Sequence, residues 1–237
     1  MKQLNAKQIE ELKQFDTPTV CNAVERFNLR GKTEGFMNPS VKSVFPDRPP
    51  LVGYACTAKI SAAQPPTAEQ KDLLFAYYQQ VKDTPAPPIA VIQDVDETPV
   101  GSFWGEVQAT VHKALGCMGV ITNGGVRDLD EVRDLGFTYF SSCVLVSHGF
   151  IHVESVNVPV TFGGVTVNPG DLLHADKHGV LVIPGAIAHE LADACRLTQD
   201  AELPMLNGCR SVPDGQVTIE QLKGWRSEME ALRSKKQ

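Results

Sequence analysis

The sequence predicts an α/β fold with a mixed central sheet and helical termini. Short apolar runs of the kind that form buried strands alternate with segments whose apolar residues recur at helical spacing. A section rich in β-branched residues and glycine turns follows late in the chain, and helical patterns return at its end. Alternating strands and helices indicate parallel strands, and the late section indicates antiparallel ones, so one mixed sheet accounts for both.

In the first half of the chain, helical and extended patterns alternate. We expect helices over residues 6–15, 18–27 and 67–82, and strands over 51–60 and 89–94. Thr17 is expected to cap the second helix, with Pro18 in its first turn, where the missing N–H costs no hydrogen bond. Gly53 suggests a bend in the first strand. The proline-rich segments 46–50 and 84–88 are interpreted as loops rather than domain boundaries.

The second half is predicted to continue the sheet and to end in helices. We expect helices over 103–115, 128–135, 186–200 and 218–234, strands over 118–122, 137–141, 144–146, 172–175 and 180–183, and a hairpin over 158–167. Val107, Val111 and Leu115 recur every four residues and are expected to form the buried stripe of the 103–115 helix. Gly136 is expected to end the helix that precedes it.

Composition favours one globular domain. The chain has 237 residues, of which 42% are hydrophobic and 21% charged, which suits a single core and leaves little room for extensive disorder. The formal net charge is −6 without a long basic run, so we expect no nucleic-acid partner. The N-terminal residues are too polar for a signal peptide, and no apolar run approaches the ~20 residues of a membrane span. We therefore expect a cytoplasmic protein that does not enter a membrane.

The stretch from Gly101 to Asp128 contains the residues most suited to chemistry. Asn123-Gly124-Gly125 is a turn at the end of an apolar strand, and it delivers Arg127 and Asp128 side by side. Ligands of open α/β sheets bind beyond the carboxyl ends of the strands. A guanidinium for an anion beside a carboxylate for a cation suits a small keto acid. On local pattern alone, a helix-capping Asp128 and a surface Arg127 are the alternative.

A second candidate lies twenty residues earlier, at Gly105 to Gln108. A glycine before a helix start leaves backbone N–H groups free for a carboxylate or phosphate, and Glu106 adds an acid–base group. The alternative is a capped helix whose glutamate is only solvated. Phe103 and Trp104 are expected in the core or an interface rather than at a substrate.

Other patterns carry weaker signals. His148 and His152 are four residues apart, but a glycine and β-branched neighbours argue against the helix that a metal site of this spacing needs. His174 and His178 flank Asp176 in a turn and are expected only to decorate it. The sequence contains no dinucleotide-binding glycine fingerprint, Walker A loop or nucleophile elbow.

The spacing from Glu106 to Arg127-Asp128 resembles the acidic-X20-Arg-Asp signature of the RraA-like family. That family holds the class II 4-hydroxy-4-methyl-2-oxoglutarate and 4-carboxy-4-hydroxy-2-oxoadipate aldolases and the regulator of ribonuclease activity A. The resemblance covers 16–185 and is supported by the segments 16–24, 53–57, 163–171 and 175–180. It implies a single RraA-like domain over 1–237, of the swivelling β/β/α type, with a helical C-terminal extension over 186–237.

Site roles follow from the resemblance, position by position. Asp128 looks like the residue that binds a divalent cation, Mg²⁺ or Mn²⁺, largely through waters. Arg127 looks like the residue that holds the keto acid end of the substrate. The loop of Gly105, Glu106, Val107 and Gln108 looks like the one whose backbone amides take the pyruvoyl carboxylate, and Glu106 would orient or deprotonate a water on the cation.

The activity implied is retro-aldol cleavage of a 4-hydroxy-2-oxo acid with release of pyruvate, and oxaloacetate decarboxylation as a side activity. The resemblance also implies a homotrimer or homohexamer with sites at subunit interfaces, where a neighbouring subunit's C-terminal glutamate can assist; Glu190 and Glu202 are candidates. Two alternatives stay open: a non-catalytic regulator that binds an RNase, and a sugar-acid lyase or dehydratase with the same metal–enolate chemistry. Asp128 favours the enzyme, because the regulators typically lack that acid. Asn123 departs from the family, where aspartate is common.

Overall fold

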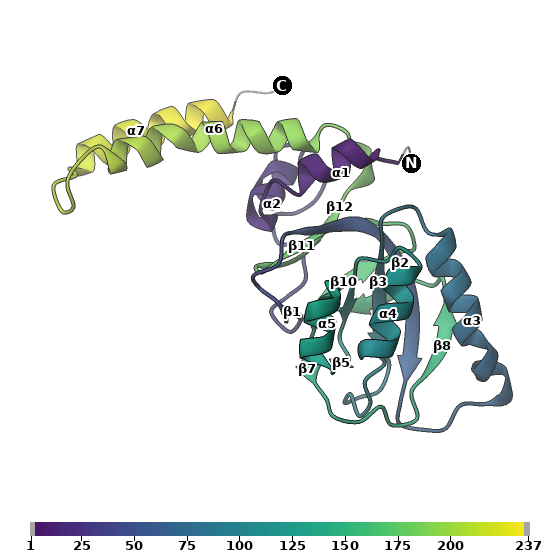
Figure 1. Ribbon diagram of the computed structural model, residues 1–237. Helices are drawn as coiled ribbons and strands as arrows, with labels where there is room; N and C mark the ends of the chain where they lie inside the picture. Colours follow the sequence, from purple (N-terminus) through teal and green to yellow (C-terminus); the bar gives the residue numbers. More distant parts are fainter. Residues whose placement is uncertain (1–2, 235–237) are drawn as a thin grey trace.

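The computed structural model describes residues 3–234 and shows an α/β body from which a two-helix arm extends (Figure 1). The helices are α1 Ala6–Leu12, α2 Thr17–Glu25, α3 Ala68–Asp83, α4 Glu106–Ala114, α5 Leu129–Leu135, α6 Leu191–Arg210 and α7 Ile219–Arg233. The strands are β1 Lys42–Ser43, β2 Leu51–Ser61, β3 Pro88–Asp94, β4 Gly119–Thr122, β5 Gly125–Val126, β6 Thr138–Ser141, β7 Cys143–Val144, β8 His152–Val156, β9 Val160–Phe162, β10 Val165–Val167, β11 Leu172–Asp176 and β12 Gly179–Ile183. Within residues 3–234, no helix combines the length and the apolar character that a membrane crossing requires.

The predicted mixed sheet is confirmed. Its strand order is β1-β6-β4-β3-β2-β11-β12, and β8 also pairs with β2. Strands β2, β3, β4 and β6 are parallel to one another, whereas β11 and β8 run antiparallel to β2. Two small sheets, β9–β10 and β5–β7, complete the topology. Because the carboxyl ends of four parallel strands lie at one edge, the loops that follow β2, β3, β4 and β6 gather at one end of the molecule.

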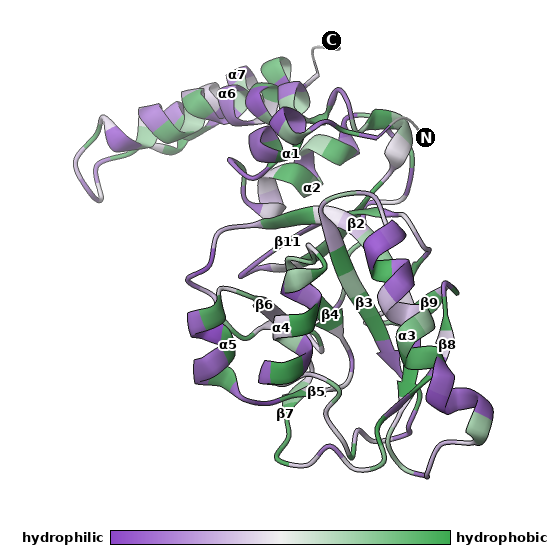
Figure 2. Ribbon diagram, turned by 45° about the vertical axis from the view of Figure 1, so that its right-hand side comes forward, coloured by the Kyte–Doolittle hydropathy of each residue, from purple (hydrophilic) through white to green (hydrophobic). Residues whose placement is uncertain are grey.

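Strand β3 shows how the sequence fills both faces of the sheet. Ile89 and Val91 point to a core that the β9–β10 hairpin covers, whereas Ala90 and Ile92 point to a core beneath α3, α4 and α5. A strand that is buried on both faces is apolar along its whole length, as a parallel sheet requires. In Figure 2 the central strands are accordingly hydrophobic, while α4 and α5 alternate between hydrophobic and hydrophilic residues.

The arm is the hairpin of α6 and α7, and it leaves the body opposite the loops at the carboxyl edge (Figure 1). The first turns of α6 pack on α2, with Leu191, Ala194 and Cys195 buried in a third core that α1 and α2 share. We expected this helix to end near residue 200. It continues through Pro204 to Arg210 because its second half packs along α7, where the ring of Trp225 lies against Gly208.

The cap of α2 lies one residue earlier than expected. Asp16, not Thr17, caps the helix, since its Oδ1 accepts a hydrogen bond from the Thr19 N–H at 2.8 Å. Gly53 lies where the chain before β3 approaches β2 closely: a Cβ there would lie 2.2 Å from the Pro87 carbonyl oxygen. A glycine is therefore required by packing rather than by backbone conformation.

The predicted stripe of α4 was wrong at Val107, whereas Leu115 packs against the core. The helix begins at Glu106 rather than 103, and Val107 is 74% exposed. The buried face is formed by Ala109 and His112 instead. His112 donates from Nδ1 to the Gln108 carbonyl oxygen at 2.7 Å, and its Nε2 accepts from the Tyr77 hydroxyl at 2.9 Å. The ring is thus a neutral core residue, and burial lowers its pKa to about 4.

A second histidine has a structural role that the sequence did not suggest. His174 is fully buried on β11, where its Nε2 donates to the Leu12 carbonyl oxygen at 3.2 Å and its Nδ1 accepts from the Thr17 hydroxyl at 2.9 Å. Asp176 accepts the Thr17 N–H at 2.9 Å. These bonds attach the start of α2 to the sheet, so His174 and Asp176 do more than decorate a turn.

We predict that His112 makes the protein less stable in acid. A histidine whose folded pKa lies below its unfolded value of about 6.5 contributes stability that is complete above that value and is lost as the pH falls towards the folded pKa. His112→Gln should therefore reduce the loss of unfolding free energy between pH 7.5 and pH 5 by about 2 kcal/mol relative to the wild type. Urea unfolding at both pH values measures this difference, and equal losses in the two proteins would contradict it.

Candidate active site

The turn after β4 is fastened to the neighbouring strand by one side chain. Asn123 Oδ1 accepts the Asp94 N–H at 2.8 Å, and Asn123 Nδ2 donates to the Asp94 carbonyl oxygen at 2.8 Å. The amide therefore extends the pairing of β3 and β4 by one residue. This double role explains why asparagine stands here: an ionised aspartate has no donor for the carbonyl group. The turn that leads to Arg127 and Asp128 is rigid as a result.

A second set of bonds joins the loop before α4 to the same turn. The Arg127 N–H donates to the Trp104 carbonyl oxygen at 2.9 Å, and Trp104 forms a parallel bridge with Val126. The Ser102 hydroxyl lies 2.7 Å from the Trp104 carbonyl oxygen and 2.8 Å from that of Gly125. Trp104 is fully buried, as expected for a core residue. The two predicted parts of the site are thus parts of one hydrogen-bonded unit.

The parts meet at the carboxylate of Asp128. Its Oδ2 accepts the Glu106 N–H at 2.9 Å and lies 3.8 Å from Arg127 Nε. Asp128 adopts the left-handed conformation, with φ +54°, and its side chain makes no capping bond to its own helix α5. It therefore supplies the N-terminal acceptor of α4, which Gly105 cannot provide. A Cβ on residue 105 would lie 2.4 Å from Asp128 Oδ2, so glycine is required there.

The first turn of α4 retains two unused donors. Among residues 3–234, no acceptor is found for the N–H groups of Val107 and Gln108. The Glu106 carboxylate is exposed and has no hydrogen-bond or ion-pair partner in the same part of the chain. The Gln108 side chain points away, since its Oε1 accepts from the Tyr78 hydroxyl of α3 at 2.8 Å. Two amides and one carboxylate are thus available to a ligand.

Arg127 borders the loop that follows β6. Its Nη1 donates to the Val146 carbonyl oxygen at 3.4 Å, and about a third of the side chain is exposed. The guanidinium keeps most of its donors free for an anion. Arg127, Asp128 and the start of α4 therefore lie together at the carboxyl edge of the sheet.

The arrangement fits a loosely held divalent cation. No group of three or more His, Cys, Asp or Glu side chains in residues 3–234 is placed to hold a metal ion. Asp128 Oδ1 has no partner there, and the carboxylate is partly exposed. One carboxylate with space for waters and substrate is a usual coordination for Mg²⁺, which keeps several waters. Glu190 is the N-cap residue of α6 and Glu202 lies within α6, where it accepts from Arg233 of α7 at 2.9 Å.

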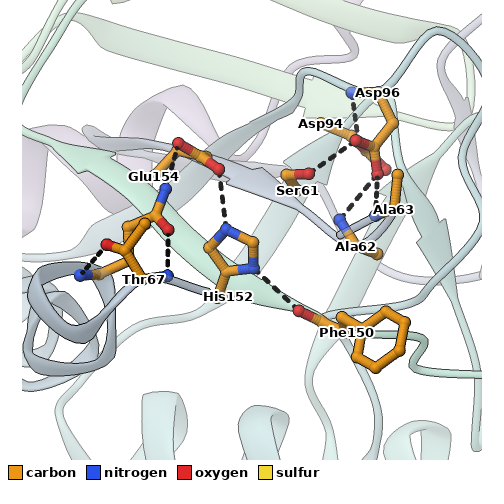
Figure 3. Close-up of polar contacts among 10 residues, drawn as sticks. Ser61, Ala62, Ala63, Thr67, Asp94, Asp96, Phe150, His152 and Glu154 are labelled. Atoms are coloured by element: carbon orange, nitrogen blue, oxygen red, sulfur yellow. Dashed lines mark hydrogen bonds and ion pairs between the residues drawn. The ribbon is translucent and has the colours of Figure 1, made fainter. Parts of the chain in front are cut away.

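Next to the turn lies a polar cluster at the end of β3 (Figure 3). Asp96 accepts from the Ser61 hydroxyl at 2.7 Å and from the N–H groups of Ala62 and Ala63. Asp94 is only 2% exposed, its Oδ1 accepts the Asp96 N–H at 3.0 Å, and its Oδ2 has no partner. Burial raises the pKa of Asp94 to about 6. The sequence shows that β3 ends in acidic residues, Asp94 and Asp96. It does not show that the backbone of Asp94 bonds to Asn123 in the turn after β4.

In the histidine pair at 148 and 152, both ring nitrogens of His152 have hydrogen-bond partners within the protein. His152 is bonded through Nδ1 to the Phe150 carbonyl oxygen and through Nε2 to Glu154 Oε1, both at 2.8 Å (Figure 3). Glu154 also accepts from the amide of Gln70 at 2.8 Å. These bonds join β8 to the start of α3. His152 therefore has a structural role, whereas the exposed His148 contacts the carbonyl oxygen of its neighbour Gly149.

The chain is similar to known proteins over most of its length. A family model described as RraA-like (Aldolase/RraA) matches residues 17–182. Protein DlpA of Legionella pneumophila is 36% identical over 106 residues, which cover 42% of this chain but only 17% of DlpA. A Halalkalibacterium halodurans protein named "Putative 4-hydroxy-4-methyl-2-oxoglutarate aldolase" is 25% identical over 184 residues, or 76% of this chain and 80% of that protein.

Among solved structures, Streptomyces coelicolor RraAS2, which its title calls an unusual member of the RNase ES inhibitor RraA protein family, superposes with a TM-score of 0.66. The match covers 85% of this chain and 95% of that chain at 21% identity. At that identity the likeness concerns the fold. It confirms the RraA-type architecture expected from the sequence.

We predict that Asn123→Asp lowers the unfolding free energy by about 1–3 kcal/mol at pH 7.5, because it leaves the buried Asp94 carbonyl oxygen without its donor and adds a charge beside Asp94. Urea unfolding measures the change. Asn207→Asp, at an exposed position of α6, is the matched control and should change the free energy by less than about 0.5 kcal/mol. Equal effects of the two substitutions would contradict the role given to Asn123.

Proposed function

The chain belongs to the RraA-like family, and from that premise we propose that it is a divalent-metal-dependent lyase that cleaves a 4-hydroxy-2-oxo acid and releases pyruvate. The observation that carries the proposal is the 2.9 Å bond from the Glu106 N–H to Asp128. That bond brings an unpaired carboxylate, a helix N-terminus, a guanidinium and a potential cation ligand to one place. The aldolase name of the Halalkalibacterium halodurans relative supports the same activity.

Binding of the 2-oxo acid would use the two ends of the site. The free N–H groups of Val107 and Gln108 and the positive end of the α4 dipole suit the carboxylate of the pyruvoyl part. The guanidinium of Arg127 would bind the same end of the substrate through charge-assisted hydrogen bonds. Asp128 would hold the cation, Mg²⁺ or Mn²⁺, through its unpartnered Oδ1. When bound, that ion supplies positive charge that polarises the 2-oxo carbonyl group.

Cleavage requires a base for the 4-hydroxyl group. The Glu106 carboxylate, free of protein partners, would accept this proton, either directly or through a water. The C3–C4 bond then breaks, its electron pair passes into the enolate of pyruvate, and C4 becomes the carbonyl carbon of the second product. Arg127 would stabilise the negative charge that develops on the enolate oxygen. The same enolate forms when oxaloacetate loses CO₂, so a decarboxylase side activity belongs to the proposal.

The assembly is part of the same proposal. We infer a homotrimer or a dimer of trimers in which the sites lie between subunits. Glu190 or Glu202 of one subunit could complete a neighbouring site only if α6 reaches across, because both belong to that helix or its N-cap and the arm extends away from the carboxyl-edge loops of its own chain. Light scattering coupled to gel filtration tests this inference directly.

We predict that Asp128→Ala abolishes metal-dependent release of pyruvate from 4-hydroxy-4-methyl-2-oxoglutarate and oxaloacetate, with a loss in kcat/KM of at least about 100-fold. A coupled lactate dehydrogenase assay with Mg²⁺, and with a chelator in its place, measures the release. Asp130→Ala changes an exposed carboxylate two residues away and should retain activity. No turnover of any 4-hydroxy-2-oxo acid by the wild type, or equal turnover by the Asp128 variant, would refute the lyase.

We predict that Arg127→Ala weakens substrate binding and turnover while the protein still folds. The guanidinium makes one long bond to the Val146 carbonyl oxygen, so its removal should leave the thermal midpoint within a few degrees of the wild type. The value of kcat/KM should fall by about 100-fold, and Arg127→Lys should restore only part of it because lysine lacks the two-pronged geometry. A variant that does not fold would assign Arg127 a structural role instead.

A further inference from the structure

The loops at the carboxyl edge of the sheet contain a single permanent cation. These loops follow β2, β3, β4 and β6 and span 62–67, 95–105, 123–128 and 142–151, all of them described by the structure. Arg127 is the only lysine or arginine in them. Asp96, Glu97 and Asp128 lie in the same loops, so the net charge of these loops is negative. One guanidinium in acidic surroundings suits one carboxylate of a ligand and repels a second.

The side chains beside Arg127 are aliphatic and turned outward. Strand β7 pairs in parallel with β5, so that Val144 lies opposite Val126, and the Leu145 N–H donates to the Val126 carbonyl oxygen at 3.0 Å. Leu145 packs against Gly125, whose added Cβ would lie 2.5 Å from the leucine. Alternation along this extended segment then turns Val144 and Val146 to the other side, where they are 57% and 95% exposed.

These two valines lie next to the proposed substrate. The carbonyl oxygen of Val146 accepts a hydrogen bond from the guanidinium of Arg127. The side chain of Val146 is attached to the same residue and therefore lies close to that guanidinium. The first turn of α4, whose Glu106 N–H donates to Asp128, exposes Val107. Exposed aliphatic side chains gathered around a polar centre are typical of a surface that is covered when a ligand binds.

We propose that the substrate is a 4-hydroxy-2-oxo acid with a single carboxylate, whose groups on C4 are uncharged and apolar and pack against Val144 and Val146. This inference rests on the proposed lyase function and adds the substrate class to it. A second carboxylate at C5, as in 4-hydroxy-4-methyl-2-oxoglutarate, would lose water against aliphatic side chains without gaining a cation in the loops described above. A methyl group at that position would gain contact instead.

The reaction of such a substrate is balanced without any further reagent. In 4-hydroxy-4-methyl-2-oxopentanoate the 4-hydroxyl group gives up its proton, the C3–C4 bond breaks, and C4 leaves as the carbonyl carbon of acetone. The electron pair of the broken bond forms the enolate of pyruvate, which takes up one proton at C3. The products are one pyruvate and one acetone.

The test compares two substrates that differ only in one group on C4. 4-Hydroxy-4-methyl-2-oxopentanoate carries a methyl group where 4-hydroxy-4-methyl-2-oxoglutarate carries a carboxylate. With Mg²⁺ and the full chain, we expect kcat/KM for the monocarboxylate to exceed that for the dicarboxylate by at least about tenfold. Pyruvate formation measures both rates, with two pyruvates counted for each dicarboxylate cleaved.

A charge added at Val146 should reverse the preference. Val146→Lys supplies the missing cation and should shift the ratio of the two kcat/KM values at least tenfold towards the dicarboxylate. Leu29→Lys adds the same charge at an exposed position outside these loops and should leave the ratio unchanged. A dicarboxylate preference in the wild type, or an unchanged ratio in Val146→Lys, would overturn the inference alone. If neither substrate is cleaved, the proposed function is refuted and the inference with it.

Discussion

The hydrogen bond from the Glu106 N–H to Asp128 Oδ2 is the constraint on which the site depends. The N-cap residue of helix α4 is a glycine without a capping side chain, so the acceptor for the Glu106 N–H comes instead from a residue twenty-two positions after Glu106. Gly105 must lack a Cβ for that carboxylate to fit, and Asp128 must adopt a left-handed conformation to present it. The acidic-X20-Arg-Asp spacing therefore has a physical meaning: it is the length of chain that passes down α4, through β4 and back to the start of the same helix.

Much of the fold could be predicted from the sequence, because the buried strands are recognisable as short apolar runs. The run Ile89-Ala90-Val91-Ile92 is apolar at every position, and the structure buries it on both faces. Gly136 ends α5 in the left-handed conformation expected of a C-terminal glycine. The turn at Asn123 was also recognisable. Its bonds to Asp94 were not, because the asparagine must be known to lie beside another strand before its amide can be assigned partners.

The failures share one cause. Val107 and Val111 fit a helical stripe, yet α4 buries His112 because Tyr77 and the Gln108 carbonyl group satisfy both nitrogens of the imidazole. His174 is buried for the same reason. From the sequence alone, a polar side chain is expected to be exposed unless its hydrogen-bond partners are known. For His112 and His174, partners such as Tyr77 and Thr17 lie tens of residues away in the sequence. The exposed valine at position 107 then becomes informative, because an aliphatic side chain left outside the core is available to a ligand at the candidate site.

The two oxygens of Asp128 serve different purposes, and this limits which substitutions the candidate site can accept. The carboxylate completes the end of α4 with one oxygen and leaves the other for a ligand. Replacing it with a softer or longer ligand, as a designer would do to recruit a different metal, removes the acceptor from the helix at the same time. If Asp128 holds the cation as proposed, a change of metal preference must arise from positions around it that carry no bond of the fold. Residue 128 is therefore the position of the candidate site that is least free to change.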